Sequence, residues 1–402
     1  MSKWKMVKLS DVFTLQMGKT PSRDNPDYWN GSHKWASIAD LGKAEKYICD
    51  TKESITDSAI SETGIKATHK GTVVMSFKLS IGKTAIAAED IYTNEAIMSF
   101  IDRQTYSYDI DYIYHLFSGK DWSEGTNKAV KGVTLNKATL SQIIIPLPPI
   151  ETQRQIAENL DKVTRFIDLC NSILYRLDLL VKSRFVEMFG DVFDNSQRFK
   201  AVTLQTLIDD GDIIYHLDGN HGSNYPRNEE FTETGVPYIG ANCISNGNVD
   251  FKLAKYLSQE RAARLRKGVA QNNDVLFAHN ATVGPVAVLR TQEPKVILST
   301  SLTAYRCNTD IINPYYLCAY MKSDGFVKQY SSDMKQTTRN QVPITAQRKY
   351  FFMIPMLDLQ DQFASFVEQT DKSKSAVKQV LGKAETLKKA LMQKYFEKVE
   401  RK

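Results

Sequence analysis

The chain has 402 residues and a formal charge of +6, from 52 Lys and Arg against 46 Asp and Glu, and is long enough for two or three domains. It has no apolar run near the ~18 residues of a membrane span and no secretory signal pattern, so a cytoplasmic protein is expected. Its five cysteines are scattered without CxxC spacing, which excludes a zinc ribbon and a disulfide framework.

The segments 1–147 and 196–354 contain short apolar runs separated by Gly, Asn and Asp. This composition predicts mixed α/β globules with irregular, loop-rich surfaces. The predicted strands include 73–77 and 274–278, and the predicted short helices include 112–117 and 203–208.

Between the two globules, residues 150–189 contain neither Pro nor Gly. Apolar residues recur there in alternating steps of four and three, a heptad pattern that predicts a long helix packed lengthwise against another helix. These residues are Ile156, Leu160, Val163, Ile167, Cys170, Leu174, Leu177 and Val181. Pro148-Pro149 marks the start and Gly190 the end, and at ~1.5 Å per residue the rod is about 60 Å long.

The C-terminal segment, about 358–400, has a similar but less regular pattern, interrupted by Thr370 and Lys374 and containing Gly382. Its apolar positions are Phe363, Val367, Val377, Leu381, Ala384, Leu391 and Tyr395. We expect the two helices to form an intramolecular antiparallel coiled coil that holds the globules apart. The alternative is a zipper between two copies of the chain.

The two halves of the chain resemble each other in the same order, at separations that grow from about 195 to about 207 residues. The matches include Trp4 to Leu9 with Phe199 to Leu204, Val73-Val74 with Val275-Leu276, and Pro148 and Gln153 with Pro355 and Gln360. One ancestral unit of about 200 residues was therefore duplicated. A pseudo-twofold protein suits a pseudo-twofold ligand.

Catalytic motifs are absent from the sequence. Gly18-Lys19-Thr20 and Gly82-Lys83-Thr84 resemble phosphate loops, but Phe13 and Phe77 stand where such loops need Gly. Asn313-Pro314-Tyr315-Tyr316 faintly resembles the flipped-base clamp of amino-methyltransferases, but it lacks the second Pro, so Asn313 is expected to be a helix N-cap. We therefore predict no catalytic residue and no metal ligand, and favour a binding protein.

Polar and basic residues gather in loops of both globules, and they suit the recognition of double-stranded DNA. Lys and Arg neutralise phosphates, whereas Asn, Gln and Arg can pair with base edges. The candidates of the first globule are Thr20, Ser22, Arg23, Lys78, Lys83, Lys128 and Lys131. Those of the second are His216, Asn220, His221, Tyr225, Arg227, His279, Asn280, Thr282, Lys335, Gln336, Arg339 and Asn340. Lys128 and Lys131 suit phosphates, and Arg227, Asn280, Arg339 and Asn340 suit base edges.

Six segments along the chain form a recognisable series: Val7-Lys8-Leu9, residues 18–23, residues 145–153, Asp218-Gly219-Asn220-His221-Gly222, residues 279–284, and Ile354-Pro355 with Gln360. The most specific is the proline-plus-glutamine helix start, which occurs twice, with Met356 and Leu357 in the second copy where the first has Pro149 and Ile150. With these segments the chain resembles, from end to end, the specificity (S) subunit of type I restriction-modification systems.

The resemblance implies two target recognition domains that each read half of an interrupted DNA sequence, and two conserved helices that set the spacing. The implied domains are 1–147 and 196–354, and the implied spacer helices are 148–195 and 355–402. It implies a subunit without its own cofactor, assembled with two methyltransferase (M) subunits and two restriction (R) subunits. Those partners would bring S-adenosylmethionine for DNA methylation, and ATP and Mg.

Two other interpretations stay open from the residues alone. One is a DNA methyltransferase or nuclease with a degenerate active site in one globule. The other is a scaffold protein that does not bind nucleic acid.

Overall fold

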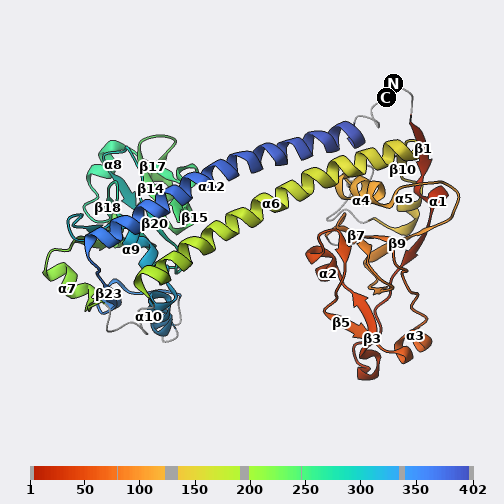
Figure 1. The fold of residues 1–402 in the computed structure, drawn as a ribbon, viewed down its shortest axis with the longest axis horizontal. Helices are drawn as coiled ribbons and strands as arrows, with labels where there is room; N and C mark the ends of the chain where they lie inside the picture. The colour runs from red at the N-terminus through yellow and green to blue at the C-terminus, as the bar shows by residue number, and fades with distance from the viewer. Residues whose placement is uncertain are drawn as a thin grey trace. The chain divides into compact units, whose positions relative to one another are not determined.

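The computed structural model describes residues 4–78, 80–122, 135–190, 199–245, 247–334 and 340–397. The chain divides into two compact units, one made of 1–171 with 379–402 and the other of 172–378. Each unit contains a mixed α/β globule, as predicted, and a part of both long helices, α6 (Ile150–Phe189) and α12 (Leu357–Met392) (Figure 1).

The first globule is built on two sheets, with strand orders β2-β9-β6-β7-β4 and β5-β3-β8. A separate antiparallel pair, β1 (Lys5–Lys8) with β10 (Ile144–Leu147), joins its first strand to its last. The sheet strands are β2 (Phe13–Met17), β3 (Trp29–Ala36), β4 (Tyr47–Ile48), β5 (Glu53–Ile55), β6 (Val73–Ser76), β7 (Thr84–Ala87), β8 (Tyr92–Thr93) and β9 (Ile97–Asp102). The helices are α1 (Leu9–Val12), η1 (Pro26–Tyr28), α2 (Ile38–Lys43), α3 (Asp57–Thr63), α4 (Ile110–Gly119) and α5 (Lys137–Gln142).

The core of the first globule also takes in both long helices. Ile156 and Leu160 of α6 are buried among its apolar side chains, together with Phe396 from the turn after α12, η6 (Gln393–Glu397). The Phe396 ring lies 5.8 Å from the ring of Tyr112 on α4. This unit therefore anchors one helix by its first turns and the other by its last.

The second globule repeats this plan. Its sheets have the orders β12-β22-β19-β20 and β13-β17-β14-β21-β18, and β11 (Ala201–Thr203) pairs antiparallel with β23 (Phe351–Met353). The other strands are β12 (Ile213–Asp218), β13 (Phe231–Thr232), β14 (Val236–Ile239), β15 (Ile244–Ser245), β16 (Asn248–Val249), β17 (Lys255–Leu257), β18 (Val269–Ala270), β19 (Val275–Ala278), β20 (Val286–Val288), β21 (Val296–Leu298) and β22 (Leu302–Cys307). The helices are α7 (Leu204–Asp209), η2 (Gly222–Asn224), η3 (Asn228–Glu230), η4 (Ala241–Cys243), η5 (Phe251–Leu253), α8 (Gln259–Ala263), α9 (Pro314–Tyr320), α10 (Asp324–Met334) and α11 (Ile344–Gln347).

An aromatic cluster joins the second globule to its share of the long helices. Phe363 of α12 lies 5.5 Å from Phe185 and 5.6 Å from Phe189 of α6, between ring centroids. Phe189 in turn lies 4.8 Å from Tyr316 on α9. Burial of a Phe side chain contributes about 1.5–3 kcal/mol, so this cluster fixes the helix ends firmly.

Within the second unit the two helices run antiparallel. The Lys374 ammonium lies 2.7 Å from Asp178, while Phe363 meets Phe185, so residue numbers rise along one helix as they fall along the other. Thr370 is 5 % exposed and its hydroxyl donates to the Phe366 carbonyl. The two residues that interrupt the predicted pattern therefore occupy heptad positions, where an ion pair and a backbone hydrogen bond satisfy them.

The predicted heptad residues of α6 are all buried or half-buried. Several apolar residues in the middle of α6 outside that pattern are exposed, including Phe166 at 44 % and Leu169 at 55 %. This contrast is what a coiled coil requires, and it confirms the pattern. The helix ends at Gly190, which has a φ of 75°, as predicted from its place after the last apolar residue.

The proline-plus-glutamine repeat performs the same task twice. Gln153 and Gln360 are fully buried, and each side-chain amide donates to the carbonyl of the proline five residues earlier, Pro148 or Pro355, at 2.7 Å. Gln153 also accepts from the backbone N–H of Asp109, and Gln360 from that of Asn313, both at 2.9 Å. The repeat therefore fixes the start of each long helix to its own globule.

The local predictions agree with the structure where it can test them. Strands β6 and β19 and helices α4 and α7 lie on the segments predicted for them. Asn313 caps α9 by accepting from the Tyr315 N–H at 2.9 Å, with Pro314 as the first helical residue. Among the described residues, no helix has both the length and the apolar character needed to cross a membrane.

Candidate nucleic-acid interface

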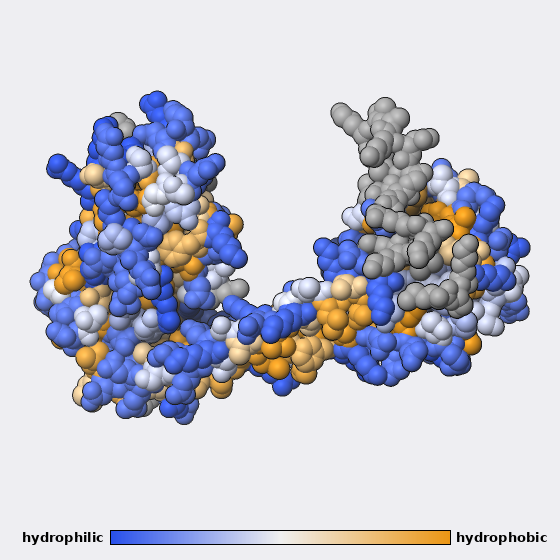
Figure 2. Space-filling view, turned by 90° about the horizontal axis from the view of Figure 1, so that it is seen from above, coloured by the Kyte–Doolittle hydropathy of each residue, from blue (hydrophilic) through white to orange (hydrophobic). Residues whose placement is uncertain are grey.

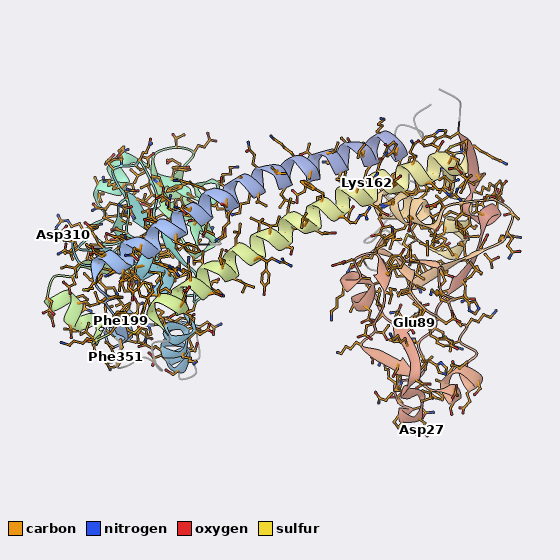
Figure 3. The ribbon with its side chains drawn as sticks, viewed as in Figure 1. Asp27, Glu89, Lys162, Phe199, Asp310 and Phe351 are labelled. Carbon is orange, nitrogen blue, oxygen red and sulfur yellow. The ribbon has the colours of Figure 1, made fainter. Side chains whose placement is uncertain are left out.

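In the first globule the loop after β2 carries Thr20, Ser22 and Arg23. The Thr20 hydroxyl donates to Glu95, and Arg23 makes a bidentate pair with Glu53, whose Oε2 lies 3.0 Å from Nη2. This pair lowers the pKa of Glu53. The loop continues into η1, whose Asp27 marks one end of this globule (Figure 3). Thr20 and Arg23, two residues predicted to bind DNA, thus already have hydrogen-bond partners within the chain.

The Arg23 guanidinium also stacks on indole rings. Its carbon lies 3.9 Å from the centroid of Trp29 and 5.3 Å from that of Trp35. The Trp29 indole N–H donates to the Ser22 carbonyl at 3.0 Å, which holds the loop over the rings. The loop is therefore ordered by cation–π and backbone contacts.

The remaining cations of the first globule follow β6. Lys78 is half-buried, with its ammonium 5.3 Å from the centroid of Phe77, and Lys83 is exposed beside Gly42 of α2. Lys128 and Lys131 lie outside the described residues. Lys78 and Lys83 both reach the surface, where phosphates could be bound.

In the second globule three of the predicted residues, Tyr225, Arg227 and Thr282, line one pocket of about 630 Å³. Tyr238 also borders it and is 7 % exposed, and its hydroxyl has no hydrogen-bond partner in the described part of the chain. Burial raises the pKa of Tyr238, and the neighbouring Tyr225 raises it further. Phe231, Asn242 and Lys255 complete the aromatic, amide and cationic lining.

A buried polar network lies beneath the loops of the second globule. The Gln347 amide oxygen accepts from the Tyr305 hydroxyl at 2.6 Å and lies 3.1 Å from His216 Nε2. Its amide nitrogen lies 3.2 Å from both His279 Nδ1 and Thr303 Oγ1. Burial lowers the pKa of both His216 and His279 to about 4, so both imidazoles are neutral at neutral pH.

Three of the predicted DNA contacts have buried side chains in or near this network. His216, His279 and Asn220 are 4–6 % exposed. His279 Nε2 donates to the Thr300 carbonyl at 2.9 Å, and the Asn220 amide donates to the Lys267 carbonyl at 2.6 Å. Their side chains are therefore committed to holding loops together, and direct contact with DNA would require those loops to open. The sequence prediction placed them on the surface because each stands among loop-forming residues.

The exposed candidates of the second globule lie above this network. Asn280 forms an antiparallel bridge with Gln341, and the Ala281 N–H donates to the Asn340 carbonyl at 3.2 Å. Asn280, Thr282 and Asn340 therefore belong to one loop surface. His221 is exposed and paired with Asp218 at 2.7 Å. Lys335, Gln336 and Arg339 lie outside the described residues.

Sequence reasoning missed the residues that position these loops. Nothing around Gln347 in the sequence marks it, because its side-chain partners other than the Val342 carbonyl are 42 to 131 residues away. The same holds for Asp161 of α6, which lies 2.8 Å from Lys46 and 2.7 Å from His115 Nε2 inside the first unit. Among the described residues, no group of three or more His, Cys, Asp or Glu side chains is arranged to hold a metal ion.

Comparison with known proteins identifies the family. The family model described as the type I restriction modification DNA specificity domain matches residues 1–179 and again 211–388. The chain therefore belongs to this family and carries its domain twice, which confirms both the resemblance and the duplication inferred from the sequence.

Named relatives share this assignment. The MjaIX specificity subunit of Methanocaldococcus jannaschii is 24 % identical over 378 residues, which cover 91 % of this chain and 86 % of the relative. The EcoBI specificity subunit of Escherichia coli is 22 % identical over 331 residues, covering 74 % and 67 %. Both carry the name of type I restriction enzyme specificity subunits.

Solved structures share the fold across nearly the whole chain. The S subunit of a type I restriction-modification system from M. genitalium matches with a TM-score of 0.57 at 15 % identity, covering 98 % of this chain and 96 % of that one. A chain from a study of complex assembly and conformational transition of the type I R-M system matches with a TM-score of 0.60 at 16 % identity, covering 98 % and 97 %.

Proposed function

We propose that this subunit gives a type I restriction-modification complex its sequence specificity by reading an interrupted DNA target, one half-site with each globule. The observation that carries the proposal is the repeated glutamine at each helix start, with Gln153 and Gln360 making the same two hydrogen bonds. Two equivalent readers, each fixed to a long helix, suit a target with two halves.

The physical benefit of two readers is additive discrimination. Each mismatched base pair costs about 1–3 kcal/mol, and well-separated positions contribute independently. This addition requires that the readers be held rigidly, because a loose connection would lose part of the second binding event to chain entropy. The buried aromatic anchors of both long helices supply that rigidity within each unit.

The subunit itself is proposed to do no chemistry and to bind no cofactor. Methylation with S-adenosylmethionine and ATP- and Mg-dependent restriction would belong to two methyltransferase and two restriction subunits in the cytoplasm. Each unit exposes apolar side chains on its own share of α6, Phe166 and Leu169 in one and Leu179 and Leu180 in the other. In the face drawn in Figure 2 the long helices carry hydrophobic patches, which supports a docking role for them.

Mapping of methylated adenines tests this proposal directly. A host without its own methylation would express the chain with its methyltransferase subunit, and its genome would be sequenced for modified bases. We expect one motif of two short specific parts separated by a spacer of fixed length. A single uninterrupted motif, or methylation that does not depend on this chain, would overturn the proposal.

A change of helix length tests the spacing role. Seven residues inserted at matching heptad positions of α6 and α12 lengthen each helix by ~10.5 Å at 1.5 Å per residue. We expect the spacer to grow by about three base pairs while both half-sites stay the same. An unchanged spacer would contradict the role of the helices as a ruler. As a control, seven residues inserted into the loop after α3 should leave the spacer unchanged.

A further inference from the structure

The two globules contain equivalent aromatic pairs that differ in what lies between them. Strand pairing establishes the equivalence. In each globule the first aromatic residue pairs across the sheet with an aliphatic residue, and the second pairs with a charged residue. In the first globule Trp29 faces Ile55 and Trp35 faces Glu53, and in the second Phe231 faces Leu257 and Tyr238 faces Lys255.

In the first globule a side chain of the globule itself lies over the aromatic pair. Trp29 and Trp35 meet edge to face at 5.1 Å, and the flat guanidinium of Arg23 lies over them. The Glu53 carboxylate accepts two hydrogen bonds from the Arg23 guanidinium. A planar cation and its carboxylate thus occupy the aromatic pair together.

In the second globule the carboxylate is replaced by an ammonium. Lys255 stands at the position of Glu53, with its nitrogen 4.5 Å from the Phe231 ring centroid and 3.3 Å from the Asn228 amide oxygen. Arg227 borders the same pocket of about 630 Å³, a volume within the ~300–1,000 Å³ of small-molecule sites. Two cations beside aromatic side chains suit a ligand that brings its own negative charge.

The floor of this pocket is polar. A side chain at Gly240 would meet Asn242 Oδ1 at 2.9 Å, Ser299 Oγ at 3.1 Å and Ser301 Oγ at 3.5 Å, so these three groups converge where Gly240 leaves space. Tyr238 belongs to the same lining, and its hydroxyl oxygen is buried. The equivalent position in the first globule is Ser37, whose hydroxyl accepts from the Asp40 N–H as a helix cap.

We propose that this pocket of the second globule binds one nucleotide unstacked from DNA, with its base against Tyr225, Phe231 and Tyr238 and its phosphate at Arg227 and Lys255. Aromatic faces stack on any base, and the amide and hydroxyl groups of the floor can pair with a base edge. The proposal rests on the proposed function, because it assumes that the loops of this globule meet DNA.

Nucleotide binding by the full chain tests the proposal. The probe is the 5′-monophosphate of 2-aminopurine deoxyriboside, whose fluorescence falls when its base stacks on an aromatic ring. We expect saturable quenching by the wild type at millimolar probe. Lys255→Glu replaces one of the two cations by a carboxylate, as at Glu53 in the first globule, and we expect it to weaken binding at least tenfold.

Lys252→Glu is the matched control. Lys252 is exposed on η5, three residues from Lys255, and it does not line the pocket. We expect it to change the dissociation constant less than twofold. Equal weakening by both variants would reduce the effect to general electrostatics and overturn the site. Absence of quenching by the wild type would overturn it as well.

Two further measurements isolate the base from the phosphate. Tyr225→Ala should weaken probe binding severalfold while the chain keeps its unfolding transition, because Tyr225 is 45 % exposed. Inorganic phosphate should compete far less well than the probe, and equal competition would overturn base binding. A bipartite methylated motif without nucleotide binding would defeat only this inference, whereas nucleotide binding without such a motif would defeat only the proposed function.

Discussion

The cores of the two globules differ at five equivalent buried positions, although β2, β9 and β6 pair in the same order as β12, β22 and β19. Leu15 pairs with Phe100 in the first globule where His216 pairs with Tyr305 in the second, and β6 and β19 align in the same way. The first globule has Leu15, Phe77, Met98, Phe100 and Leu140, and the second has His216, His279, Thr303, Tyr305 and Gln347. One frame therefore accepts either an apolar cluster or a polar network.

An apolar cluster and a buried polar network place different requirements on the core. An apolar cluster needs only volume and shape, whereas a buried polar network must satisfy nearly every group at once. In the second globule Gln347 meets this demand, since both ends of its amide are used. His216 Nδ1 is left without a partner among the described residues. The network is thus specific, and it is vulnerable at one residue.

The largest expected effect is that of acid on the second unit. Both network imidazoles have a pKa of about 4 when folded, against about 6.5 when unfolded. The unfolded chain therefore binds more protons as the pH falls from about 6.5 to about 4, and the free energy of unfolding decreases over that range. The upper bound is roughly 3 kcal/mol per imidazole, at about 1.4 kcal/mol per pH unit.

Urea unfolding at neutral and acidic pH measures this loss. The matched control exchanges all five residues for those of the first globule, as His216→Leu, His279→Phe, Thr303→Met, Tyr305→Phe and Gln347→Leu. We expect this variant to lose clearly less stability in acid than the wild type. An identical loss in both would assign the acid sensitivity to groups elsewhere, such as His115, whose pKa burial also lowers.

The next largest effect is expected from removal of the Gln347 amide. Gln347→Leu alone leaves the partners of the amide buried and unsatisfied, at about 1–3 kcal/mol for each such group. We expect a loss of about 3 kcal/mol in the free energy of unfolding, measured by chemical denaturation. The five-residue exchange should be less destabilising than this single change, because it removes the polar partners together. A single variant as stable as the wild type would show that the network contributes nothing.

The smallest effect concerns the ion pair of the first globule. Arg23 is 53 % exposed, so its pair with Glu53 is largely screened by solvent. We expect Glu53→Lys, which copies the second globule, to cost about 0.5–1 kcal/mol in chemical denaturation. Asp24→Lys makes the same charge change one residue from Arg23 and should cost less. Equal effects would mean that net charge, and not this pair, is responsible.

Sequence reasoning succeeded where structure is decided locally. The limits of α6 follow from Pro148-Pro149 and Gly190, and the duplicated Gln153 and Gln360 were visible as a repeat. It identified Thr370 and Lys374 as polar interruptions of the apolar pattern, but it could not show which groups satisfy them. Lys374 is explained by Asp178, nearly two hundred residues earlier on the other helix.

The candidate site was less predictable for the same reason. Residue type and loop context selected Tyr225, Arg227 and Thr282 separately, and only the structure shows that they line one pocket. They could not separate exposed His221 from buried His216, because the difference is made by Gln347 across 131 residues. The position of Arg23 over Trp29 and Trp35 also depends on the carboxylate of Glu53, which lies 30 residues further along the chain.

The edge pairs β1–β10 and β11–β23 have a consequence for how such proteins diversify. In each pair, the first strand of the globule lies beside the strand that leads into a long helix. Genetic exchange at those two points would transfer a whole globule and leave the helices in place. Because each core includes residues of the long helices, the transferred globule must fit those same residues. If each globule reads one half-site, as proposed, such an exchange would change that half-site alone.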